Sequence, residues 1–220
     1  VQNMSFEGFA NCEVSGIYLT GGINFYNSQI NINKLSAKNN KSGDDLINIV
    51  NSKFELNNLY MENSLYDALD IDYSEGNIIN IKCLNCGIKK GGDGIDLANS
   101  NIFIENAYIS NSFDKGLSIG ENSQANIKNL IVQEANVCIA NKDGSYTKIK
   151  YAEVKNCNIG LAAFNKKSYY DISKLEISVV NFDNNVSNIL RDNTNKIILG
   201  GWEVTDPATI NNKILEKIYE

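Results

Sequence analysis

The chain has 220 residues, 43% of them hydrophobic, and its 20 basic and 26 acidic side chains give a net charge of −6. This balance argues against a nucleic-acid partner, which needs a basic face, and the absence of histidine removes the commonest general base and every Ser-His-Asp arrangement. No run of about 18 apolar residues exists, so we expect no membrane span. The chain begins at Val1 without a leader pattern, so we expect a mature form or an excised part of a longer protein.

The first predicted element is an irregular first turn over residues 1–22. Within it, Gly16–Leu19 echoes a strand phrase that returns further along the chain. Residues 23–195 carry the repeats, and residues 196–220 are expected to form a C-terminal cap. We treat the whole chain, 1–220, as one domain.

A six-residue phrase with apolar first, fourth and sixth positions dominates the repeat region. Its starts lie 22–26 residues apart. A period near 23 with strand-like content indicates a solenoid, and it is too short for most helix-pair repeats. The occurrences are INKLSA (Ile32–Ala37), LNNLYM (Leu56–Met61), IINIKC (Ile78–Cys83), IENAYI (Ile104–Ile109), IKNLIV (Ile127–Val132), IKYAEV (Ile149–Val154) and ISKLEI (Ile172–Ile177).

A second phrase precedes most hexads and alternates apolar and polar residues, as in DALDIDYS (Asp67–Ser74). Alternation of period two indicates strands whose apolar side chains point inward. We therefore predict an all-β parallel β-helix of about eight coils, each of about 22–26 residues. The residues expected to point outward in this strand are Asn48, Asp70, Asp96, Ser118, Ala140 and Ala162.

Asparagine recurs at two fixed points of the repeat, where its side chain tolerates bent backbone and can bond the coil above or below. We predict structural ladders there. The two sets are Asn58, Asn80, Asn106 and Asn129, and Asn39, Asn63, Asn85, Asn111 and Asn156.

Five cysteines are present, and Cys83 and Cys86 have the C-x-x-C spacing of redox and metal sites. Both fall in columns that otherwise hold small or apolar residues. We therefore expect the cysteines to pack in the core as free, small hydrophobic side chains.

The repeat fades after Thr194. Asp206 and Pro207 then have the character of an N-cap and a first helical residue, followed by apolar residues near helical spacing. We predict a capping helix that closes the open end of the solenoid.

The phrases DALDIDYS, GDGIDL, DKGLSIGENS, IANKDGS and IGLAAFNKK carry a family resemblance. The pattern over about residues 16–195 resembles the right-handed parallel β-helix, or pectin-lyase-like, superfamily. More closely, it is similar to β-helical segments of large bacterial surface proteins that can accompany a spore-coat-H-like kinase domain. The resemblance implies a right-handed coil, an extracellular or cell-surface location, a glycan partner and further domains in a longer parent chain.

An acidic cluster is the first candidate site. Asp70 and Asp96 share one outward column on adjacent coils, roughly 5 Å apart, and Asp72 lies on the same face. Stacked carboxylates repel, so we expect a shared proton or a shared cation, for which Ca²⁺ is the natural candidate. Lys115, one coil on, completes a candidate catalytic set with Asp70 and Asp96.

Two chemistries would suit this cluster: glycoside hydrolysis by paired carboxylates, and proton abstraction by a lysine beside a calcium-bound uronate. The Gly-Asp-Gly-Ile-Asp sequence resembles the aspartate-bearing strand of pectin-cleaving hydrolases. Their Gly-His-Gly is missing, and Arg191 lies about four turns away. The alternative interpretation is structural, with aspartates that cap bends or stand on a solvated face.

Ligand-binding residues are also expected outside the acidic cluster. Lys89 and Lys90 lie in an inserted loop just before Asp93, and an aromatic and basic edge follows in the later coils. Exposed rings stack on sugars, and lysines meet carboxylates; the alternative is a solvated bend. The residues of this edge are Phe164, Lys166, Lys167 and Tyr169, with Tyr170 beside them.

From these features we expect a non-catalytic β-helix domain of a bacterial surface or secreted protein that binds or presents glycan, or acts as a rigid scaffold. The alternative is a polysaccharide lyase or glycoside hydrolase with an atypical, His-free acidic site.

Overall fold

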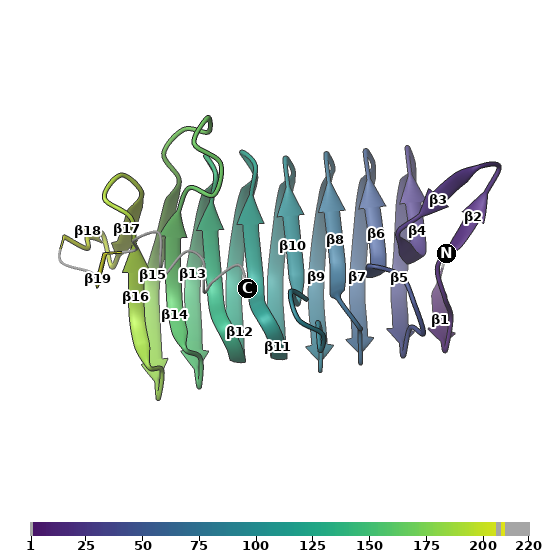
Figure 1. Ribbon diagram of the computed structural model, residues 1–220, viewed down its shortest axis with the longest axis horizontal. Helices are drawn as coiled ribbons and strands as arrows, with labels where there is room; N and C mark the ends of the chain where they lie inside the picture. The colour runs from purple at the N-terminus through teal and green to yellow at the C-terminus, as the bar shows by residue number, and fades with distance from the viewer. Residues whose placement is uncertain (1, 206–207, 210–220) are drawn as a thin grey trace.

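The computed structural model describes residues 2–205 and 208–209, which form strands and turns and contain no helix. The chain winds into a parallel β-solenoid of about eight turns (Figure 1), as predicted. Most turns hold one shorter and one longer strand. The shorter strands are β4 (Gly21–Tyr26), β6 (Asp45–Val50), β8 (Asp67–Asp72), β10 (Ile95–Ala98), β14 (Ile159–Phe164) and β16 (Ser187–Arg191).

The longer strands bend around the solenoid, and two of them continue through both sides of a coil. These two are β11 (Asn101–Gly120) and β12 (Gln124–Lys142). The others are β5 (Gln29–Lys38), β7 (Lys53–Glu62), β9 (Glu75–Leu84), β13 (Tyr146–Lys155) and β15 (Lys174–Asp183).

Both ends of the solenoid carry short strands. At the N-terminal end β1 (Asn3–Glu7) pairs with β5. At the other end β17 (Lys196–Leu199) pairs with β15. There β18 (Trp202–Glu203) pairs with β17, and β19 (Ala208–Thr209) pairs with β16. The capping helix predicted from Asp206 onward falls largely outside the described residues; Ala208 and Thr209, which are described, form a strand.

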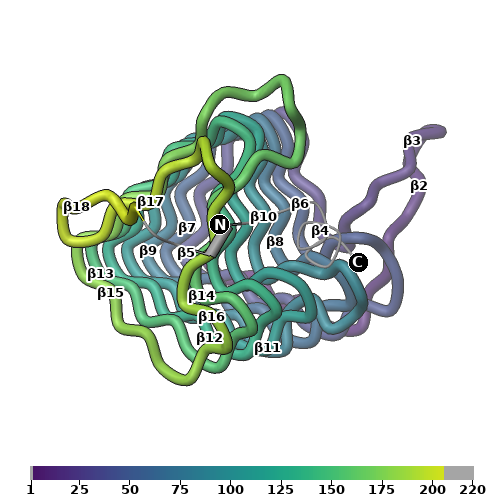
Figure 2. The backbone as a smooth tube through the Cα atoms, turned by 60° about the vertical axis from the view of Figure 1, so that its left-hand side comes forward, coloured from purple at the N-terminus to yellow at the C-terminus, as the bar shows by residue number. Residues whose placement is uncertain are grey.

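The core fills the bore of the solenoid, seen nearly end-on in Figure 2. Ile47, Leu69, Leu117 and Ile139 come from one strand position in different coils, and each is fully buried. Burying each such side chain stabilises the fold by about 1.5–3 kcal/mol. The predicted inward set is therefore confirmed.

The two predicted asparagine ladders are also present. At the corner after the longer strands, Asn63 donates to Asn39 at 2.8 Å and Asn85 donates to Asn63 at 3.0 Å. These residues have a left-handed backbone, with φ of 55° at Asn63, which asparagine tolerates better than most residues. A serine ladder was missed: the Ser52 amide donates to the Ser74 hydroxyl at 3.0 Å, and the contact repeats in neighbouring coils.

Replacing Asn63 with alanine is expected to lower the free energy of unfolding by about 1–2 kcal/mol, because alanine is strained in the left-handed region. Thermal or denaturant unfolding measures this loss. Asn57, which donates to Asn33 at 3.1 Å from ordinary backbone, is the matched control. Asn57→Ala should change stability by less than about 0.5 kcal/mol, and an equal loss in both variants would contradict the backbone argument.

The last hexad was placed wrongly. Ile149 pairs with Ile177, not with Ile172, so the equivalent phrase begins five residues later than the pattern indicated. The reason is the loop between β14 and β15, which projects from the body of the solenoid (Figure 2) and absorbs the extra residues. Ile172 lies in that loop and is 54% exposed.

The strand echo at Gly16–Leu19 was also wrong. Residues Cys12–Val14 (β2) and Ile17–Leu19 (β3) form a separate antiparallel hairpin with Ser15 and Gly16 in its turn. This hairpin extends beyond the first coil (Figure 1). The first of the shorter strands of the solenoid is instead β4, which pairs with β6.

The cysteines are buried as predicted, except for Cys12, but four of them are not free. Cys83 bonds Cys86, and Cys138 bonds Cys157. The Cα atoms in each pair lie 5.9 Å apart, a distance that a disulfide spans. The repeat columns indicated burial but said nothing about which side chains meet at a corner. Cys12, on the hairpin, is exposed and free.

Two residues predicted to face outward, Ala140 and Ala162, point away from the bore yet are buried. They belong to a second, smaller apolar cluster outside the bore, together with Phe164 and Leu190. Ser118 and Asn48 are buried as well. The outer face at this position of the repeat is therefore partly buried, and it is not the solvated surface that alternation predicted.

Candidate functional site: an acid–lysine cluster and an axial groove

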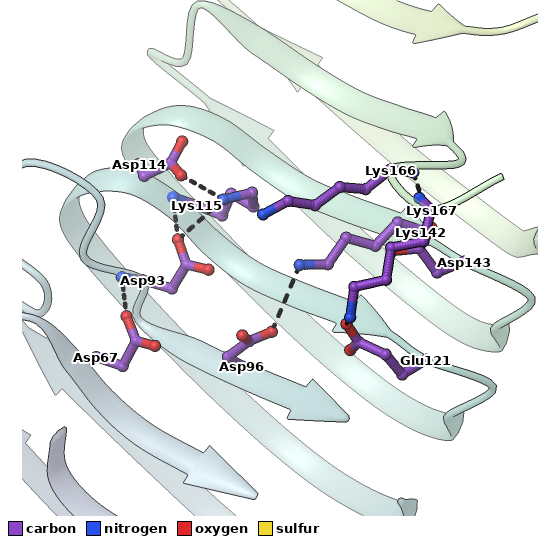
Figure 3. Close-up of polar contacts among 10 residues, drawn as sticks. All are labelled: Asp67, Asp93, Asp96, Asp114, Lys115, Glu121, Lys142, Asp143, Lys166 and Lys167. Carbon is purple, nitrogen blue, oxygen red and sulfur yellow. Dashed lines mark hydrogen bonds and ion pairs between the residues drawn. The ribbon is translucent and has the colours of Figure 1, made fainter. Parts of the chain in front are cut away.

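A line of aspartates begins the shorter strands and holds the backbone of the next coil. The Asp93 amide donates to Asp67 Oδ1 at 2.7 Å, and the Lys115 amide donates to Asp93 Oδ1 at 2.8 Å (Figure 3). Burial, followed by the charge of Asp93, raises the pKa of Asp67 well above its usual value. Asp67 and Asp93 therefore have a structural role, but the backbone bonds that they accept come from the following coil and not, as predicted, from their own bends.

Lys115 lies at the centre of a buried ion cluster. Its Nζ is 3.4 Å from Asp93 Oδ1 and contacts the carboxylate of Asp114. Burial opposes the charge of this lysine, but Asp93 and Asp114 more than offset that effect and raise its pKa. Lys115 is thus held between two carboxylates, and the structure does not present it as an open base beside Asp70 and Asp96.

Asp70 on β8 and Asp96 on β10 are register partners on adjacent parallel strands, as predicted, and the partner of Asp72 is Ala98. Burial, reinforced by Asp72, Asp45 and Asp96, raises the pKa of Asp70 to about 9. Asp70 is therefore protonated at neutral pH.

The neighbours of Asp70 differ in their surroundings. Burial and the charge of Asp96 raise the pKa of Asp72 to about 6, and Asp96 has Lys142 Nζ at 3.9 Å (Figure 3). Among residues 2–205 and 208–209, no three His, Cys, Asp or Glu side chains converge to hold a metal ion. Asp70, Asp72 and Asp96 are therefore not preassembled for Ca²⁺, and a calcium role for them remains a prediction.

The aromatic and basic edge does not form one exposed surface. Phe164 is fully buried and packs in the outer apolar cluster, so its predicted stacking role is wrong. Lys167 pairs with Glu121 at 2.7 Å, and the Lys166 amide donates to Asp143 at 2.7 Å. Tyr169 is 75% exposed, with its ring centre 4.7 Å from that of Tyr170.

The two lysines of the inserted loop are exposed. They lie between β9 and β10, where the Lys89 amide donates to the Leu65 carbonyl at 2.8 Å. A binding role for Lys89 and Lys90 remains a prediction.

A groove that sequence reasoning missed runs along the solenoid axis, over the starts of the longer strands. One part has a volume of about 430 Å³ and crosses β5, β7, β9, β11 and β12. A second part, about 380 Å³, lies beside it over the preceding corners and shares Lys53, Glu75 and Asn101 with the first. The groove thus continues across successive coils.

Asparagine and glutamine are the commonest residues of the groove wall, which also contains apolar residues and charged groups that pair with neighbours. Lys53 meets Glu75 at 3.3 Å, and Asn77 donates to Glu55 at 2.6 Å. Three aromatic residues join this lining: Phe54 from β7, which is buried, Phe103 from β11, and Tyr73, which is 63% exposed. The signal in the sequence was a polar column three residues before each hexad: Gln29, Lys53, Glu75, Asn101 and Gln124.

Comparison with protein-family models, with curated proteins and with solved structures gave no match. Within the described part of the chain, no helix has the length and apolar character needed to cross a membrane. Lys115 is paired with carboxylates inside the acid–lysine cluster, whereas amides and aromatic rings line the axial groove.

Proposed function

We propose that this β-solenoid binds an extended, uncharged glycan along its axial groove, as a domain of a secreted or cell-surface protein. One observation carries the proposal: a groove lined by amides and by the accessible aromatic rings of Phe103 and Tyr73 continues over successive coils. Amide groups donate to and accept from hydroxyls, and aromatic faces cover the apolar faces of sugar rings. Such a lining suits a polymer that follows the stacked coils.

The charge of the groove favours a neutral polymer over a uronate. The larger part of the groove is lined by one cation, Lys53, and two carboxylates, Glu55 and Glu75. Lys53 is already paired with Glu75, so a polyanion would meet no unopposed positive charge there. The uronate partner suggested by the resemblance to pectin-cleaving enzymes is therefore less favoured than a neutral chain.

A secreted or surface location is part of the same proposal. The two disulfides support it, since disulfides persist mainly in oxidising compartments. The resemblance to β-helical segments of bacterial surface proteins points the same way and suggests that other domains of a longer protein accompany this one. We also propose that the solenoid is related to the pectin-lyase-like superfamily and that its coil is right-handed.

Titration calorimetry against neutral and uronate oligosaccharides tests the proposal. Phe103→Ala and Tyr73→Ala are each expected to weaken binding of a neutral oligosaccharide by about tenfold, which is the loss of one aromatic contact. Tyr169→Ala, at the exposed edge far along the chain, is the control and should leave affinity unchanged. Loss of binding in the Tyr169 variant alone would move the site to that edge, and binding of uronates only would overturn the neutral class.

A catalytic role at the acidic cluster is the second candidate. Its support is the pair Asp70 and Asp72, whose pKa values of about 9 and about 6 differ as those of an acid and a base do. Asp70→Asn should then abolish glycan cleavage while leaving binding in the groove intact. Absence of cleavage by the unaltered protein would leave the binding function alone.

A further inference from the structure

Lys115 is a primary amine enclosed with two carboxyl groups and shielded from water. Its side chain is 6% exposed, that of Asp93 is 5% exposed and that of Asp114 is 11% exposed. The amine lies 3.4 Å from Asp93 Oδ1 and contacts Asp114 (Figure 3). The site therefore holds, away from water, an amine (Lys115), a carboxyl carbon that an amine can attack (Asp93) and a carboxylate that can carry a proton (Asp114).

We propose that Lys115 and Asp93 join through an intramolecular amide bond between Lys115 Nζ and Asp93 Cγ. The bond would covalently link neighbouring coils, because Asp93 lies two residues before β10 and Lys115 lies in β11, which pairs with β10. This inference is independent of the proposed glycan function, since the groove contains neither residue.

The reaction is a condensation that needs no oxidant or cofactor. A bond forms between Lys115 Nζ and Asp93 Cγ, and the bond from Cγ to Oδ2 breaks. The ammonium brings three protons; one remains on the amide nitrogen, and two leave with the carboxyl oxygen as water. The ammonium and carboxylate charges cancel, so the product is neutral.

The surroundings of Asp93 favour its role as the acyl partner. The Lys115 backbone amide donates to Asp93 Oδ1 at 2.8 Å, which holds that oxygen as the carbonyl and leaves Oδ2 to depart. Burial raises the pKa of Asp93, so its neutral acid form is accessible. A neutral acid beside a neutral amine also loses less hydration on burial than an ion pair does.

Asp114 is assigned the proton transfer. Its carboxylate contacts Lys115 Nζ directly, so it takes a proton from the ammonium and passes it to the departing oxygen. The raised pKa of Lys115 means that the amine becomes nucleophilic only through this transfer. Asp114 is the chain neighbour of Lys115, and a bond to it would link no separate coils.

Tryptic digestion of the denatured, reduced protein tests the proposal. Trypsin cuts after lysine and arginine, and none occurs between Lys90 and Lys115 or between Lys115 and Lys128. Without the bond, mass spectrometry should find peptides 91–115 and 116–128. With the bond, cleavage at Lys115 is blocked, and one peptide, 91–128, should appear with a mass lower by one water.

The digestion separates the bond from a simpler dehydration. Asp93 precedes Gly94, and a succinimide at that step would also lose one water, but Lys115 would stay cleavable. Separate peptides 91–115 and 116–128 from the folded protein therefore overturn the proposal, whatever the intact mass.

Variants identify the partner residue. Asp93→Ala should restore cleavage at Lys115, whereas Lys142→Arg, which alters a neighbouring lysine of the cluster, should leave the joined peptide in place. Retention of the joined, dehydrated peptide in Asp93→Ala would assign the bond to another carboxyl group and overturn the pairing. Circular dichroism of each variant shows whether the solenoid has folded. The digest of the unaltered protein tests the bond by itself, so the test does not depend on the folding of any variant.

Discussion

Replacing Lys115 with methionine is expected to lower the free energy of unfolding by about 3–5 kcal/mol at neutral pH. Methionine keeps most of the side-chain volume but removes the cation that lies between Asp93 and Asp114. Both carboxylates would then be buried without their partner. Denaturant unfolding at pH 7 measures the loss, and at about pH 4 the loss should shrink because protonated carboxyl groups need no cation.

The control for this change is Lys128, which pairs with Glu105 at 3.0 Å on the surface with its side chain 48% exposed. Lys128→Met should cost less than about 1 kcal/mol. Equal losses in the two variants would show that burial of the Lys115 cluster contributes nothing. A covalent bond from Lys115 to Asp93 would act in the same direction, and the tryptic peptides separate the two effects.

Asp70→Asn is expected to raise stability at neutral pH by on the order of 3 kcal/mol. The pKa of Asp70 is raised in the folded protein to about 9, against about 4 in an unfolded chain. The contribution of Asp70 to the free energy of unfolding is therefore fully present below about pH 4 and is lost as the pH rises toward 9. Asparagine has nearly the same shape and no charge, so the variant should gain at pH 7–8 and gain little at pH 4.

The same variant decides the question of calcium. In a calcium site, Asp70→Asn would remove a ligand and lower the unfolding temperature in added Ca²⁺, since a ligand bound only to the folded state stabilises it. Thermal unfolding of both proteins in EDTA and in Ca²⁺ at constant ionic strength gives the answer. Asp44→Asn, at an exposed acid beside the cluster, should change stability by less than about 0.5 kcal/mol.

The coils were predictable because their residues obey one period. Apolar residues such as Leu69 return at the same point of each turn, and asparagines such as Asn63 return at each corner. Those positions are set by contacts with an identical position one coil away. The loop before β15 broke the period, and the hexad at Ile172 was misplaced because periodicity carries no information across an insertion.

The site was less predictable because it depends on contacts between different columns. Register placed Asp70 opposite Asp96 correctly. It did not reveal that the carboxylate of Asp114 contacts Lys115, or that the side chain of Phe164 packs in the outer apolar cluster. The axial groove was missed for a related reason: its residues look like ordinary solvated side chains until the corners of neighbouring coils form a continuous hollow.

The in-register stacking of coils makes the length of the molecule a modular quantity. Among the strands that the structure describes, each coil pairs with the coils next to it, so stability accumulates coil by coil. Duplication of one internal coil would extend the axial groove by one rung, roughly 4.8 Å, without altering the floor of the others. Under the proposed function, the number of coils would set how many units of a polymer the protein spans.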